Sequence, residues 1–114
     1  MKLPRKVRIG ASAYTVEQLT SEMRELSGAD GLCDKTLYSI HVNPNMNIVR
    51  EWSTVFHEVH HAFVDEYNIP VPNDMEEDVV SGFTLAGLCF MRDNPTYIIN
   101  LMRLLRGQAD NSTT

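Results

Sequence analysis

The chain has 114 residues, 43% hydrophobic and 22% charged, which is typical of a single globular domain. Fifteen acidic and ten basic residues give a net charge of −5, and that field repels a phosphate backbone, so we expect no nucleic-acid partner. No stretch approaches the run of about 18 apolar residues that a membrane helix needs, so we expect no membrane partner either.

The two cysteines, Cys33 and Cys89, are far apart in the sequence and form no C-x-x-C pair, which excludes a zinc ribbon. Two free thiols, with no apolar run of signal-peptide length, predict a cytoplasmic protein. A single disulfide between them stays open.

The first third of the chain is rich in β-prone residues. Two such runs within residues 7–16 flank the turn signal Gly10-Ala11-Ser12, which predicts a β-hairpin. Residues 17–26 are ambiguous, because a glycine-containing break soon follows their helical spacing. The run 36–42, bounded by turn signals on both sides, predicts a further strand.

The rest of the chain has the apolar period of helices. Residues 48–67 predict a first helix, which the following prolines end. A second is expected from Asn73 or Asp74 to about Arg92, and a third over 96–106. The core-facing side chains should be Trp52, Val55, Phe56, Val59 and Phe63, then Val79, Val80, Phe83, Ala86, Leu88 and Phe90, then Ile98, Leu101, Met102 and Leu105.

These elements predict an α+β fold in which a β-hairpin and a strand precede three helices. Residues 1–107 are expected to form one domain, and the polar residues 108–114 a flexible tail. The sequence makes no prediction about the oligomeric state.

The first helix carries His57-Glu58-Val59-His60-His61, which fits the pattern H-E-x-x-H. Helical residues four apart lie one above the other, so His57 and His61 can reach the same zinc ion. Glu58 lies near this stripe and is expected to activate a zinc-bound water, which then attacks a carbonyl carbon. His60 points away. The alternative is a chance match, which is rare in a chain with four histidines.

A catalytic zinc usually has three protein ligands and one open position. The metzincin extension is excluded, because Val64 and Tyr67 stand where it requires glycine and histidine. The remaining candidates are His41 and the acidic cluster 74–78 at the start of the second helix.

Within that cluster we expect Glu77 to be the third ligand, with Glu76 as the alternative and with Asp78 and His41 less favoured. Either glutamate also fits a capping box, in which Asn73 or Asp74 would cap the helix.

Residues around the ligands have more open assignments. Asp65 and Ser81 are candidates for orienting the imidazoles, or are ordinary solvated residues. Tyr38, Tyr67 and His60 are candidate oxyanion donors, and the sequence does not choose among them. The strand over 39–43 either borders a cleft and binds a peptide by strand addition, or is a core strand.

Several segments together resemble small phage and prophage proteins of the gluzincin type of zinc metallopeptidase. They are the Lys2-Leu3-Pro4 start, the segment Thr54-Val55-Phe56-His57-Glu58-Val59-His60-His61-Ala62, the acidic cluster with its paired valines (76–80), and Arg92-Asp93-Asn94-Pro95. The resemblance covers residues 2–95, and the H-E-x-x-H element is its specific part.

Such proteins are similar in turn to the ImmA/IrrE peptidases, which cleave repressors. The resemblance implies a minimal zincin-like fold, zinc on His57, His61 and Glu77, and catalysis by Glu58. A phage-encoded member would act in the host cytoplasm. Family members often have Asp or Asn four residues after the third ligand, where this chain has Ser81.

The leading hypothesis is therefore a zinc-dependent hydrolase of amide bonds, a small metallopeptidase acting on a protein or peptide. The alternative is a phage-encoded binding or regulatory protein whose zinc is structural. A third hypothesis is hydrolysis of another amide, by a deamidase or a cell-wall amidase. Glu58 favours an enzyme, because a structural site needs no base there.

Overall fold

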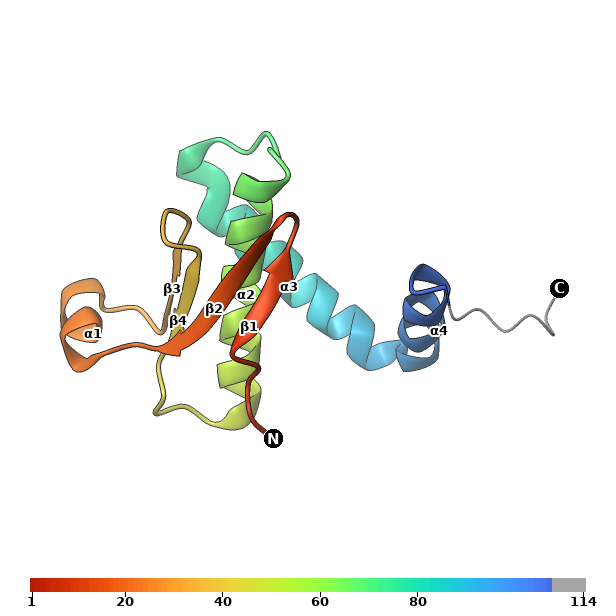
Figure 1. Ribbon diagram of the computed structural model, residues 1–114, viewed down its shortest axis with the longest axis horizontal. Coiled ribbons are helices and arrows are strands. Elements are labelled where there is room, and N and C mark those ends of the chain that lie inside the picture. The colour runs from red at the N-terminus through yellow and green to blue at the C-terminus, as the bar shows by residue number, and fades with distance from the viewer. Residues whose placement is uncertain (108–114) are drawn as a thin grey trace, which may run out of the picture. The chain divides into compact units, whose positions relative to one another are not determined.

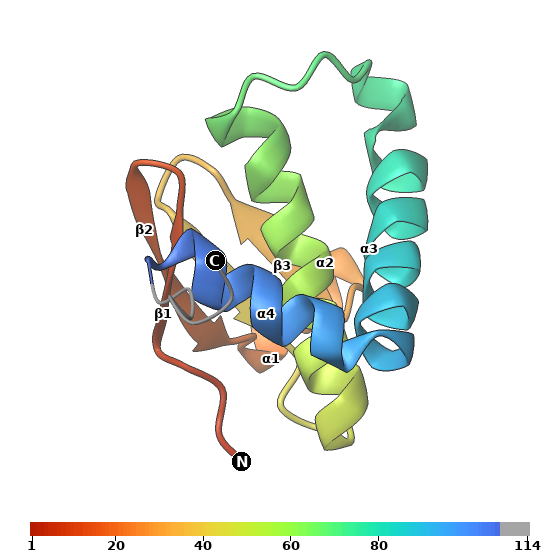
Figure 2. The same cartoon turned by 90° about the vertical axis from the view of Figure 1, so that its right-hand side faces the viewer.

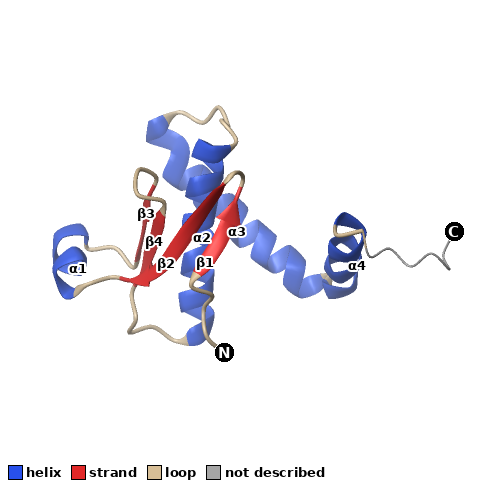
Figure 3. Ribbon diagram, viewed as in Figure 1, coloured by secondary structure: helices blue, strands red, loops and turns tan. Residues whose placement is uncertain are grey.

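The computed structural model describes residues 1–107, which form a mixed α+β structure (Figures 1 and 3). The predicted tail, 108–114, lies outside the described residues. The elements are β1 (Lys6–Ile9), β2 (Ser12–Gln18), α1 (Ser21–Ser27), β3 (Gly31–Asp34), β4 (Ser39–Val42), α2 (Ile48–Glu66), the 3-10 helix η1 (Asn73–Met75), α3 (Glu76–Asp93) and α4 (Pro95–Leu105).

By backbone contacts the chain divides into two compact units, Met1–Thr84 and Leu85–Thr114. The first holds the sheet, α1, α2 and the start of α3. In the second, the Asn94 side chain donates to the carbonyl oxygen of Phe90 at 3.0 Å, and the rings of Phe90 and Tyr97 meet edge to face. That residues 1–107 form one domain stays a prediction.

The four strands form one sheet in the order β1-β2-β4-β3. The predicted hairpin is confirmed: β1 and β2 pair antiparallel around Gly10, whose φ of 61° suits a glycine turn. β4 pairs parallel with β2 and antiparallel with β3. The predicted strand 36–42 is a strand only from Ser39, because Tyr38 has a φ of 55° in the preceding turn.

The core lies between this sheet and α2, which runs along one of its faces (Figure 1). Ile9, Tyr14, Ile40 and Val42 from the sheet meet Val55 and Ala62 from α2, and all six are buried. Burying a large apolar side chain contributes about 1.5–3 kcal/mol. This contact fixes which side of α2 faces the strands.

The face of α2 expected in the core is only partly right. Val55 is buried, and Val59 and Phe63 pack against the core cluster, as predicted. Trp52 and Phe56 are half-buried and lie outside that cluster. Ala62 and Glu58 are buried instead. The burial of Glu58 does not follow from an apolar pattern, because such a pattern places carboxylates on the solvent side.

The predicted helix boundaries agree with α2, α3 and α4 to within a few residues, but the predicted core faces of α3 and α4 are largely wrong. On α3 the buried residues are Val80 and Thr84, whereas Phe83 is 68% exposed. On α4 no residue is buried, including Ile98, Leu101, Met102 and Leu105. Both helices therefore carry large apolar side chains that are exposed rather than buried.

The cap expected before α3 is absent. η1 has no side-chain cap bond, and in the described part of the chain neither Asn73 nor Asp74 accepts one from a helix backbone N–H. The glutamates that follow are therefore available for contacts with α2. Cys33 and Cys89 are free thiols, and no helix in residues 1–107 has the length and apolar character needed to cross a membrane.

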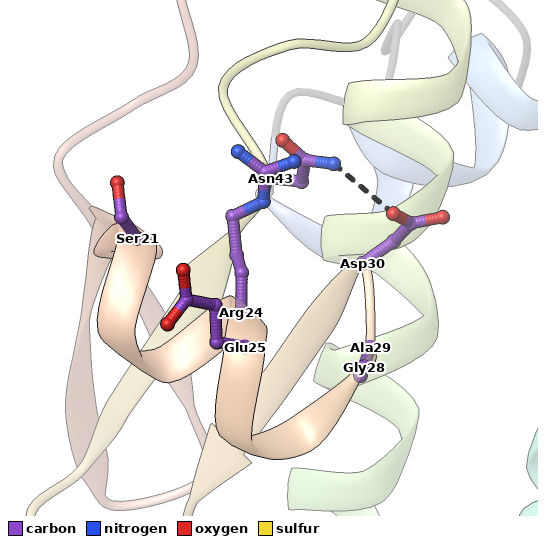
Figure 4. A pocket seen from close by; sticks show the side chains of 7 residues that line it. All are labelled: Ser21, Arg24, Glu25, Gly28, Ala29, Asp30 and Asn43. Carbon is purple, nitrogen blue, oxygen red and sulfur yellow. Dashed lines mark hydrogen bonds between the residues drawn. The ribbon is translucent and has the colours of Figure 1, made fainter.

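Asp30, the residue before β3, forms hydrogen bonds that stabilise the start of this strand. Its carboxylate accepts hydrogen bonds from the Asn43 side chain at 3.1 Å and from Arg50 at 2.7 Å. Figure 4 shows the hydrogen bond between Asn43 and Asp30, which line a pocket together with residues of α1. The hydrogen bond from Asn43 and the charge of Arg50 lower the pKa of Asp30. These bonds place Gly31, the first residue of β3, against α2.

Candidate metal centre

Two imidazoles and a carboxylate converge where α2 faces the first turn of α3. In Figure 2 the chain runs along α2, through a loop and back into the start of α3, and His57 and His61 lie one turn apart on α2, with ring centres 5.0 Å apart. Glu77 Oε1 lies 2.8 Å from Nε2 of His57 and 3.1 Å from Nε2 of His61. The structure therefore brings together the three residues expected to bind the metal.

This group could hold a metal ion, because one ligand atom from each residue lies within 4.8 Å of the others. Ligand atoms at ~2.0–2.1 Å from a tetrahedral zinc are separated by about 3.3 Å. The Glu77–imidazole spacings would need to open by a few tenths of an ångström. Two nitrogens and one carboxylate oxygen form a donor set that suits zinc and several other divalent metals.

The two neighbouring glutamates, which the sequence does not separate, have different contacts. Glu77 faces the Nε2 atoms of both histidines and is 64% exposed. Glu76 Oε2 lies 2.6 Å from Nδ1 of His61, the opposite side of that ring, and 3.2 Å from Nζ of Lys35. Glu76 is 16% exposed. Only Glu77 is therefore placed as a ligand to an ion shared by both histidines.

The charges at the site favour a cation between the helices. Burial disfavours the charged form of His61, but hydrogen bonds to Glu76 and Glu77 outweigh it and raise the pKa of the imidazole. Burial likewise opposes ionisation of Glu76 and Glu77. Hydrogen bonds with the histidines, and for Glu76 also with Lys35, overcome this effect and lower both pKa values. The carboxylates stabilise a positive charge where a divalent metal would carry its own.

Glu58 lies on the other side of the histidine stripe, toward the sheet. It is only 7% exposed, and within residues 1–107 its carboxylate forms no hydrogen bond. Burial raises its pKa, the charges of His57 and His61 lower it, and Glu77 raises it again, with a net increase. A buried carboxylate without a hydrogen bond lowers the stability of the fold.

Space for Glu58 depends on Gly31. A Cβ on Gly31 would lie 2.9 Å from Glu58 Oε2 and 2.7 Å from Thr54 Cγ2, both too close for ordinary contacts. Gly31 is the first residue of β3. Lys35 directly follows the last residue of β3 and donates a hydrogen bond to the Glu76 carboxylate. The two ends of β3 therefore border the site.

The less favoured metal ligands lie elsewhere. His41, on β4, has its Nε2 3.0 Å from the Ser39 hydroxyl, and Asp78 is exposed; neither belongs to the His57–His61–Glu77 group. His60 Nδ1 donates to the Phe56 carbonyl at 2.8 Å, and its ring meets Phe56 and Phe63 edge to face. It lies off the stripe formed by His57 and His61 on α2.

The residues suggested as supports make other contacts or none. Asp65 and Ser81 are exposed, and among the described residues neither side chain bonds an imidazole. Tyr38 packs edge to face against Tyr14, and Tyr67 against Phe63. None of these contacts brings an oxyanion donor to the site.

β4, the strand considered for peptide addition, lies inside the sheet between β2 and β3. Its backbone is paired on both sides, so an added peptide has no edge to use there. The edge strand next to the site is β3, which the sequence did not predict.

Three features of the site were not predicted from the sequence. They are the contact of Gly31 with Glu58, the hydrogen bond from Lys35 to Glu76, and the position of Glu76 beside His61. Gly31 stands in a turn-like run and Lys35 at a strand boundary, so each has an ordinary local explanation. Only the placement of β3 beside α2 reveals their role. Comparisons with protein-family models, with curated proteins and with solved structures found no match.

Proposed function

We propose that this chain is a zinc-dependent hydrolase of amide bonds, a small metallopeptidase of the gluzincin type with a minimal zincin-like fold. His57, His61 and Glu77 would hold the zinc, and Glu58 would serve as the general base. The proposal combines the H-E-x-x-H motif with the geometry of the candidate centre.

The observation that carries the proposal is the placement of Glu58. It is a buried carboxylate with a raised pKa, next to two imidazoles that converge with a third donor. A site that only stabilises the fold needs no such group, and burying it lowers stability. A base of raised pKa near a polarised water is what amide hydrolysis needs at neutral pH.

The exposure of the site supports catalysis over a structural role. Structural zinc sites are usually closed by four protein ligands, whereas catalytic ones keep a position open for water or substrate. In the described residues the group has three members, and Glu77 is 64% exposed. A fourth position left open for water or substrate fits a group of three ligands with one exposed member.

An extended peptide is the substrate we propose. β3 is an edge strand, and its two ends reach Glu58, through Gly31, and Glu76, through Lys35. Backbone groups on an edge strand can pair with an added peptide strand, which would run past the site. A peptide bond held there would lie near Glu58.

The chain's own residues would divide the work as follows. When bound, zinc would supply Lewis acidity that polarises the scissile carbonyl and makes water easier to deprotonate. Glu58 accepts one proton from the attacking water as the C–O bond forms. The same carboxyl group then delivers that proton to the amide nitrogen as the C–N bond breaks, leaving a free acid and a free amine.

The test is to incubate the zinc-loaded protein with a proteome-derived peptide library and to identify new amino termini by mass spectrometry. Wild type should generate them, and Glu58→Gln should lose this activity while keeping its zinc and its fold. Glu51→Gln, on the same helix, is the matched control and should cleave as wild type does. A zinc-loaded wild type without cleavage, or an active Glu58→Gln, would refute the proposal.

A further inference from the structure

The two histidines of the candidate centre differ in what meets the second nitrogen of each ring. For His61, Glu76 Oε2 lies 2.6 Å from Nδ1, and Glu77 lies on the Nε2 side. For His57, contacts among the described residues reach Nε2 only, again from Glu77. His61 therefore lies between two carboxylates and His57 beside one.

Glu76 is itself held in place. Lys35, just after β3, donates to its carboxylate at 3.2 Å, which ties the first turn of α3 to the sheet. Glu76 is 16% exposed, against 64% for the adjacent Glu77. A carboxylate bonded on both sides and shielded from water keeps one position better than an exposed one.

We propose that Glu76 is a positioning residue for the metal ligand His61, and that Lys35 fixes Glu76 in turn. A carboxylate at Nδ1 keeps the proton on that nitrogen, so the Nε2 lone pair is left to point at a metal. The same bond fixes the ring plane and makes the imidazole a stronger donor. The inference rests on the metal site of the proposed function.

This assignment gives the neighbouring glutamates separate tasks, Glu77 as ligand and Glu76 as its support. It also supplies the orienting group that Ser81 and Asp65, both exposed, do not provide. A merely structural role is the alternative, in which Lys35 and Glu76 only join α3 to the sheet. The two roles differ in what they do to zinc affinity.

The experiment compares Glu76→Gln and Glu76→Ala with Asp78→Asn, which removes an exposed charge from the same helical turn. Each metal-free protein is titrated with zinc in competition with a chromophoric chelator, and its thermal unfolding is measured without zinc. Zinc affinity should fall by about 10-fold for Gln and by up to about 100-fold for Ala, the range found for such supporting carboxylates. Asp78→Asn should bind within about twofold of wild type, because that side chain contacts neither histidine.

Affinity that is unchanged in both Glu76 variants, while wild type binds one zinc, would overturn this inference and leave the proposed function standing. A lower unfolding temperature without a change in affinity would assign Glu76 to the structural role and overturn it too. If wild type takes up no zinc, the proposed function itself fails. The isosteric Gln variant keeps the test decisive should the Ala variant not fold.

Discussion

Replacing Gly31 with alanine would test the close approach of β3 to α2 that the candidate site depends on. The added Cβ would lie 2.7 Å from Thr54 Cγ2, 2.9 Å from Glu58 Oε2 and 3.2 Å from Glu58 Cγ. Carbon atoms pack at about 3.5–4.0 Å, so the strand or the helix side chains must shift by up to about 1 Å.

The expected loss of stability follows from two opposing effects. Overpacking of this kind typically costs about 1–3 kcal/mol, and the smaller freedom of alanine in the unfolded chain returns about 0.4–1 kcal/mol. The net destabilisation is about 0–2.6 kcal/mol, with a middle value of about 1.3 kcal/mol. At about 4–8 °C per kcal/mol for a small domain, this middle value lowers the melting temperature by roughly 5–10 °C.

The assay is thermal unfolding of the metal-free protein, followed by circular dichroism. Gly82→Ala is the control: it lies on α3, where an added Cβ meets nothing within 4 Å. Its better helix propensity should raise stability by up to about 1 kcal/mol. If Gly31→Ala melts at or above the wild-type temperature, β3 does not approach Glu58 as described and the reasoning fails.

Three further predictions concern the fold around the site. Ile40→Ala should destabilise the protein by about 2–5 kcal/mol in urea unfolding, because Ile40 is fully buried in the core; a loss below ~1 kcal/mol would contradict that packing. Burial raises the pKa of Cys33 to about 12. In Cys89→Ser, the remaining thiol should therefore react with Ellman's reagent at about pH 8 only after denaturation. Fast reaction in the native state would contradict the burial of this thiol. The pKa of Asp30 is lowered in the folded state, so its carboxylate stabilises the fold above the pKa of an unfolded aspartate and loses this effect as the pH falls through the folded value. The melting temperature of wild type should therefore exceed that of Asp30→Asn at about pH 7, and this advantage should shrink as the pH falls below about 4, whereas an advantage independent of pH would contradict the assignment.

The helix with the histidines could be predicted closely from the sequence, because its apolar period and the two prolines after it are strong local signals. The prediction of 48–67 compares with Ile48–Glu66 in the structure. The hairpin was predictable for the same reason, since β-prone residues flank a glycine turn. β3 was not, because four residues that begin with glycine and follow a turn-like run resemble a loop.

The candidate site shows the same division. The spacing of His57 and His61 follows from helical geometry alone, and the acidic cluster pointed to the start of α3. The separate contacts of Glu76 and Glu77 could not be predicted. The two side chains have the same chemistry and differ in the direction in which they leave the helix, which depends on how α3 lies against α2. The burial of Glu58 was also beyond the apolar pattern, since it depends on Gly31 from a distant strand.

Anomalous diffraction at the zinc absorption edge, from crystals of the zinc-loaded protein, tests the central claim most directly. We predict one zinc per chain at about 2.0–2.1 Å from the nearest atoms of His57, His61 and Glu77, with an open coordination position facing Glu58. A zinc at another place, or one closed by a fourth protein ligand, would contradict the proposal that this centre is catalytic.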